Sequence, residues 1–139
     1  MNILKVFTQK RITGNIGEDA VVRYLRKNRY KILDRNYVAA GHEIDIIAEN
    51  RLYVCFIEVK ARTASKISPK EPRPACAVTP EKMYSIISAA KFYSSASIDK
   101  KKLRFDVAEV YLEDNGEVKS INYIEGAFTQ SDARKERHR

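Results

Sequence analysis

Three carboxylates and one amine interrupt two apolar stretches of the chain at every second position. The stretch "GHEIDII" contains Glu43 and Asp45, and the later stretch "FIEVKAR" contains Glu58 and Lys60. Side chains two apart on a β-strand project from the same face, so each pair shares one face of its strand. Carboxylate oxygens are preferred ligands of Mg²⁺ and Mn²⁺, and Mg²⁺ needs only one or two of them when water and phosphate complete its shell. The pattern therefore indicates a divalent-cation site beside an ammonium group.

The two stretches are expected to form a β-hairpin, because residues 50–51 read as a two-residue turn. In that register Asp45 faces Phe56 and Glu43 faces Glu58, which puts all three carboxylates on one side of the sheet. Opposed carboxylates destabilise a sheet unless something compensates them, and a divalent cation would do so. The alternative that these residues leave open is an exposed strand face with an ordinary Glu-Lys ion pair.

Hydrophobic periodicity and turn residues predict the other elements. One helix is expected at residues 14–28, and Thr79 and Pro80 are expected to be the N-cap and first position of a second helix. The predicted strands are residues 30–38, 43–49, 52–62, 103–112 and 117–125. Residues 63–78 are rich in proline and predict a loop. This order predicts an α/β domain with a central mixed, mainly antiparallel five-stranded sheet flanked by helices.

The totals bound the class of protein. A chain of 139 residues with 44% hydrophobic and 32% charged residues fits one globular domain. The net charge of +8 favours a polyanionic partner, above all nucleic acid, although such a charge also aids solubility. No apolar run is long enough to span a bilayer and no signal peptide is evident, so we expect a cytoplasmic protein without membrane association. Cys55 and Cys76 have no partners at zinc-ligand spacing.

The two ends of the chain are expected to lie outside the domain, which is predicted to cover residues 14–128. Residues 1–13 are interpreted as an N-terminal extension. Residues 129–139 include the charged run "SDARKERHR", which predicts a disordered, basic tail.

The sequence also resembles a known family over about residues 14–125. "EID" followed by "FIEVKAR" resembles the Asp…Glu-x-Lys core of the PD-(D/E)xK, or restriction-endonuclease-like, nuclease superfamily. "GEDAVVRYLRKNRYKILDRNY", "GHEIDIIAEN", "FIEVKART", "VTPEK" and "RFDVAEV" occur in the order and spacing of its YraN-like family. These are small bacterial proteins similar in fold to archaeal Holliday-junction resolvases. The resemblance implies a restriction-endonuclease-like fold and a homodimer.

The resemblance further implies a Mg²⁺- or Mn²⁺-dependent endonuclease that acts on DNA, with a preference for branched or distorted substrates. Asp45, Glu58 and the backbone carbonyl of Val59 would be metal ligands, and Lys60 would orient or activate the attacking water. Glu18 matches a helix glutamate that often assists catalysis. The alternative class is a nucleic-acid-binding module that retains the nuclease fold without cleaving.

Other residues near the expected site have less specific roles. Glu18 could equally complement the first turn of its predicted helix, and Glu43 could bind a second ion or support the first. Lys82, Arg62 and His42 are candidate nucleic-acid contacts, although solvated side chains of these types are common. His42 stands where the family usually has glycine, and the proline- and lysine-rich loop replaces a glycine-containing turn. Separately, Arg104 and Asp106 share a strand face and predict a structural ion pair.

Overall fold

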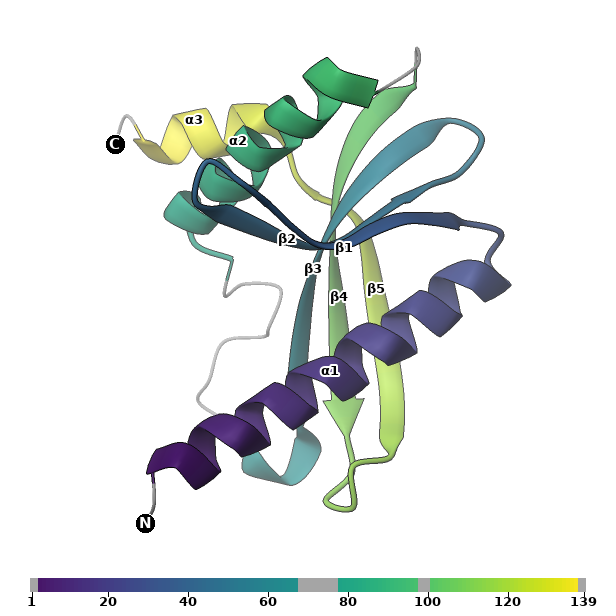
Figure 1. Cartoon of the computed structure of the whole chain (residues 1–139), viewed down its shortest axis with the longest axis vertical. Helices are drawn as coiled ribbons and strands as arrows, with labels where there is room; N and C mark the ends of the chain where they lie inside the picture. Colours follow the sequence, from purple (N-terminus) through teal and green to yellow (C-terminus); the bar gives the residue numbers. More distant parts are fainter. Residues whose placement is uncertain (1–2, 68–77, 98–100, 138–139) are drawn as a thin grey trace.

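The computed structural model describes residues 3–67, 78–97 and 101–137, which form a five-stranded sheet with its helices (Figure 1). The strands are β1 (Lys31–Ala39), β2 (His42–Glu49), β3 (Tyr53–Thr63), β4 (Lys102–Leu112) and β5 (Val118–Phe128). The helices are α1 (Ile3–Lys27), α2 (Pro80–Ser97), α3 (Gln130–Arg137) and the short 3₁₀ helix η1 (Ala64–Lys66). All five strands and the second helix confirm the elements predicted from the sequence.

The sheet is mixed and mainly antiparallel, as predicted. The strands lie in the order β1-β2-β3-β4-β5, and only β3 and β4 run parallel. A parallel pair needs a long crossover connection, and α2 lies in the crossover between β3 and β4. Figure 1 shows α1 running across the strands and α3 beside α2.

Two apolar clusters, one on each face of the sheet, hold these elements together. The cluster under α2 and α3 contains the stacked rings of Phe56, Phe105 and Phe128. The cluster under α1 contains Val21 and Leu25, both fully buried. Each such side chain stabilises the fold by about 1.5–3 kcal/mol through burial. Helices α1 and α2 therefore each pack an apolar face against the sheet, in agreement with the hydrophobic periodicity that predicted them.

A close approach of α1 to β3 positions the first helix. A Cβ atom added to Gly17 would lie 2.6 Å from the Cβ of Ala61 and 3.6 Å from a methyl group of Val59. Only glycine allows the helix backbone to come this near the strand. The contact brings the next residue, Glu18, against β3.

The turn between β2 and β3 is longer than the two residues predicted. The side-chain oxygen of Asn50 accepts hydrogen bonds from the backbone N–H groups of Leu52 (2.9 Å) and Tyr53 (2.8 Å). Glu49 consequently pairs with Val54, and the predicted pairing with Leu52 is wrong. The register shift is two residues, an even number, so the side chains of β3 keep the faces predicted for them.

The shift changes which residues meet across the hairpin. The last pair between β2 and β3 is Ile46 with Ile57, so Asp45 and Glu58 are the next residues along the two strands, and Asp45 does not face Phe56. The alternation of β2 also breaks here, because Ile44 packs in the cluster under α2 whereas Ile46 packs in the cluster under α1. The prediction that the three carboxylates share one regular face is therefore wrong.

Both ends of the chain are more helical than predicted. Helix α1 begins at Ile3, so the described part of the expected N-terminal extension continues into the helix. The expected disordered tail forms α3 over Gln130–Arg137. The Thr129 hydroxyl accepts from the Asp132 N–H (3.1 Å), and the Asp132 carboxylate accepts from the Thr129 N–H (2.8 Å). This reciprocal capping box starts the helix, and the buried Ala133 anchors it.

Candidate functional site

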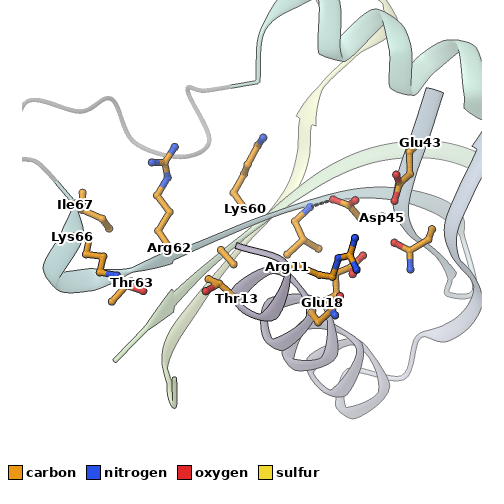
Figure 2. A pocket seen from close by; sticks show the side chains of 15 residues that line it. Arg11, Thr13, Glu18, Glu43, Asp45, Lys60, Arg62, Thr63, Lys66 and Ile67 are labelled. Atoms are coloured by element: carbon orange, nitrogen blue, oxygen red, sulfur yellow. Dashed lines mark hydrogen bonds between the residues drawn. The ribbon is translucent and has the colours of Figure 1, made fainter. Parts of the chain in front are cut away.

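A pocket of about 880 Å³ lies where β2 separates from β3, with α1 as one wall (Figure 2). Its acidic lining residues are Glu18, Glu43 and Asp45. Its basic lining residues are Arg11, Lys60, Arg62 and Lys66. The structure thus gathers most of the predicted site residues from α1, β2 and β3 around one cavity.

Asp45 is held at the edge of β3 by a backbone donor. Its Oδ2 accepts a hydrogen bond from the N–H of Val59 at 2.8 Å. Burial and the nearby charge of Glu58 raise the pKa of Asp45 to about 7, although the Val59 hydrogen bond and the charge of Lys82 act to lower it. This carboxylate therefore lies in a position that disfavours its own negative charge.

Glu58 is 5% exposed and faces two lysines. Its Oε1 lies 3.3 Å from the Nζ of Lys60 and 3.6 Å from the Nζ of Lys82. Its Oε2 is buried and has no hydrogen-bond partner within the part of the chain that the structure describes. A buried carboxylate oxygen without a partner destabilises the fold. A cation or a hydrogen-bond donor at the Oε2 of Glu58 would remove this cost.

Glu18 and Glu43 extend the acidic cluster. Glu18 is 9% exposed, and burial raises its pKa. The charge of Arg35 acts to lower that pKa, whereas Glu43 and Glu58 raise it further. The four carboxylates consequently interact with one another although they come from three different elements.

The arrangement fits a partly hydrated divalent cation better than a closed protein cage. Across residues 3–67, 78–97 and 101–137, no three Asp, Glu, His or Cys side chains converge closely enough to hold a metal by themselves. Mg²⁺ typically uses only one or two carboxylates. Asp45 and Glu58 could supply those two, because the Oε2 of Glu58 has no hydrogen-bond partner among the described residues. The carbonyl of Val59 points to the same edge as its N–H, because both groups of a strand residue share one side.

The basic side chains approach from the other side of β3. Figure 2 shows Lys60 and Arg62 projecting from one side of the strand, away from α1. Lys82 lies in the first turn of α2, where the Thr79 hydroxyl accepts from its N–H at 3.1 Å and caps the helix as predicted. His42 is the first residue of β2 and is not among the residues that line the pocket.

The chain matches the family described as "Uncharacterised protein family UPF0102" over residues 17–110. It belongs to this family. The matched span contains Glu18, Asp45, Glu58, Lys60 and Lys82, and the resemblance to the YraN-like family is thereby confirmed.

Related UPF0102 proteins come from several bacteria. One from Acetivibrio thermocellus is 45% identical over 125 residues, covering 86% of this chain and 92% of the relative. Others from Clostridium acetobutylicum and Chlorobium phaeobacteroides strain BS1 are 39% and 44% identical, each covering 83% of this chain and 92% of the relative. None of the described helices of this UPF0102 member is long and apolar enough to cross a membrane.

Some residues of the pocket were not predicted by sequence reasoning. Thr13 lines it from a turn of α1 that was assigned to the N-terminal extension, and Lys66 lines it from η1. Asn36 also lines it and has a positive φ of 52° opposite the irregular part of β2. An isolated asparagine within a strand pattern was the one signal for such a backbone irregularity.

A second buried acid, Asp106, belongs to a structural network. The Nε of Arg104 donates to its Oδ1 at 2.9 Å, which confirms the predicted ion pair. The neighbouring Cys55 is buried with a free thiol, and burial raises its pKa to about 12. That thiol stays protonated and is no nucleophile. Cys76 and most of the predicted loop at residues 63–78 lie outside the described residues.

Proposed function

We propose that this protein is a metal-dependent phosphodiesterase of the restriction-endonuclease-like type that hydrolyses DNA, with Mg²⁺ or Mn²⁺ as its cofactor. Branched or otherwise structured DNA is the proposed substrate, and a cytoplasmic homodimer is the proposed form, by analogy with archaeal Holliday-junction resolvases. The observation that carries the proposal is the buried Oε2 of Glu58 near Asp45, which has no hydrogen-bond partner among the residues that the structure describes. A divalent cation meets the demand of both carboxylates.

The residues of the chain have distinct roles in this proposal. Asp45, Glu58 and the carbonyl of Val59 would hold the ion, which would supply Lewis acidity and lower the pKa of a bound water. The ammonium of Lys60, 3.3 Å from Glu58, adds positive charge where a phosphoryl group would develop negative charge. The raised pKa of Glu18 brings proton exchange closer to neutral pH.

Titration of Mn²⁺ into the protein by calorimetry tests the site. The wild type is expected to bind Mn²⁺ and Asp45→Asn to lose that binding, while circular dichroism shows both to be folded. Glu117→Gln, which removes one exposed carboxylate elsewhere, should bind as the wild type does. Single-stranded, duplex, flap and four-way DNA are then screened for cleavage with Mn²⁺. Metal-dependent cleavage that survives in both Asp45→Ala and Glu58→Ala would contradict the assignment.

The second candidate is a module that binds nucleic acid without cleaving it. The net charge of +8 supports it, as does the lack of three converging acidic, histidine or cysteine side chains in the described residues. On this reading the carboxylates only repel the nucleic-acid backbone. Asp45→Asn would then bind DNA more tightly than the wild type in EDTA, and no DNA of the panel would be nicked with Mn²⁺.

A further inference from the structure

The pocket has carboxylates gathered at one end, with one arginine beside them, and basic side chains at the other end. Figure 2 shows Glu43, Asp45 and Arg11 at one end, Arg62 and Lys66 at the other, and Lys60 between them. We call the part formed by Arg62, Lys66 and the adjoining edge of β3 the basic arm. A ligand that spans the pocket would meet the carboxylates and Arg11 at one end and the basic arm at the other.

The floor of the basic arm is an edge of β3 that no described strand pairs with. Within the described residues, β3 beyond Ile57 pairs with β4 alone, through Thr63, since its pairing with β2 has ended. The Val59 N–H points away from β4, because it donates to Asp45. Successive backbone groups alternate in direction along a strand, so the N–H groups of Ala61 and Thr63 point the same way, into the pocket they line.

The spacing of these donors suits a chain of phosphates. Residues two apart on a strand are about 6.6–6.8 Å apart, similar to successive phosphates of an extended nucleic-acid strand. The side chains of Arg62 and Lys66 flank this row of N–H groups and add charge to it. None of the described residues that line the pocket is aromatic. The arm thus offers donors for a backbone and no platform on which bases could stack.

We propose that the basic arm seats the sugar–phosphate backbone of a single, unpaired nucleic-acid strand and leads it to the carboxylates. The inference rests on the proposed function for reading the ligand as nucleic acid. Glu18, which lines the pocket, and Glu58, which lies on β3 but is not among the lining residues, are recessed, at 9% and 5% exposure. A flexible strand can bend to reach them, whereas a stiff duplex keeps its phosphates on a convex surface. Recognition by the backbone makes the arm indifferent to base sequence.

Fluorescence anisotropy with labelled oligothymidylate and a matched duplex, both in EDTA, tests the proposal on the full chain. The wild type should bind the single strand more tightly than the duplex. Arg62→Gln and Lys66→Gln should each weaken single-strand binding about tenfold. Each should also lower the slope of log affinity against log salt by about 0.7, the value for one lost phosphate contact on a single strand. Arg51→Gln removes a charge from the exposed turn at the opposite end of β3 and should change neither value.

Three results would overturn the proposal. These are equal or tighter binding of the duplex, unchanged binding by both Arg62→Gln and Lys66→Gln, or polyglutamate competing as well as the oligonucleotide at equal charge. Failure of the basic-arm proposal can be told apart from failure of the proposed nuclease function. Loss of single-strand binding in the variants, with no cleavage by the wild type in Mn²⁺, would support the arm and remove the nuclease. Metal-dependent cleavage by the wild type that neither Arg62→Gln nor Lys66→Gln changes would support the nuclease and remove the basic arm.

Discussion

Asp106 and Glu58 are both buried carboxylates on the central strands, but their surroundings differ. Asp106 is fully buried and accepts hydrogen bonds from Arg104 (2.9 and 3.0 Å), the Tyr123 hydroxyl (2.5 Å) and the Gly126 N–H (2.9 Å). Every donor comes from the protein, and the network ties β4 to β5. Glu58 has two lysines near one oxygen and, in the described part of the chain, no partner for the other.

The two carboxylates therefore differ in hydrogen bonding. The fold supplies donors to both oxygens of Asp106, whereas the described residues supply cations near only one oxygen of Glu58. A buried acid with all its donors in place stabilises the native state, and removing it leaves a buried cation unpaired. A buried acid with an unpartnered oxygen destabilises the isolated protein until a ligand, an ion or a water supplies the missing partner. Substitutions in the two regions should therefore change stability in opposite directions.

The largest effect is expected at Asp106. Asp106→Ala removes the buried carboxylate of the Arg104 guanidinium, whose side chain is 13% exposed, and leaves it the exposed carboxylate of Glu125 at 3.6 Å. Loss of one partner of a buried ion pair typically costs about 3–5 kcal/mol, and urea unfolding should show a loss of that size. Glu117→Gln is the exposed control and should change the free energy of unfolding by less than about 0.5 kcal/mol. A loss below about 1 kcal/mol would show that the network is weak.

Substitution of Asp45 is expected to increase the stability of the protein, the opposite of the effect at Asp106. The folded-state pKa of Asp45, about 7, lies above the ordinary value of 3.8. The stability it contributes is fully present below pH 3.8 and is lost as the pH rises through about 7. In EDTA, the free energy of unfolding of Asp45→Asn should therefore exceed that of the wild type by about 2–4 kcal/mol at pH 8. The two values should be equal near pH 4.

Urea unfolding at several pH values measures this difference. Asp34→Asn, at an exposed position of β1, is the control and should leave the pH dependence unchanged. An Asp45→Asn protein no more stable than the wild type at pH 8 would show that the carboxylate is not strained in the isolated protein.

A smaller loss is expected at the contact that positions Glu18. Gly17→Ala would bring two Cβ atoms to 2.6 Å, and Ala61 has no flexible end that could move away. Overpacking of this kind costs about 1–3 kcal/mol, more than the gain in helix propensity. Gly14→Ala is the matched control in the same helix, with no atom within 4 Å of its new Cβ, and should stabilise the protein slightly. Adding Ala61→Gly to Gly17→Ala should recover most of the loss, as thermal unfolding would report.

Local patterns in the sequence predicted the elements well but not how some of them meet. Periodicity identified the strands and both core-facing helix stripes, because burial acts on one face of each element. The hairpin register was missed because the Asn50 side chain stabilises a longer turn. The tail was missed because a four-residue capping box at Thr129 outweighed its charged composition. The pocket depends on the contact of Gly17 with β3, which no local pattern contains.

The smallest effect is expected at Lys82. Comparing Lys82 with Lys60 distinguishes the effect of a nearby positive charge on Mn²⁺ binding from a role in the proposed cleavage. The Nζ of Lys82 is 3.6 Å from Glu58 and its side chain is 39% exposed, so the interaction is screened. Lys82→Gln should strengthen Mn²⁺ binding only about two- to fivefold, because one repelling cation is removed, and the gain should shrink at high salt. Lys60→Gln should strengthen Mn²⁺ binding by a similar factor, since the Nζ of Lys60 lies 3.3 Å from the same oxygen. It should nevertheless abolish the proposed cleavage, whereas Lys82→Gln should not. Calorimetric titration and cleavage assays on both variants measure the two effects. Weaker Mn²⁺ binding in either variant would mean that the lysines hold Glu58 in position for the ion and do not compete with it.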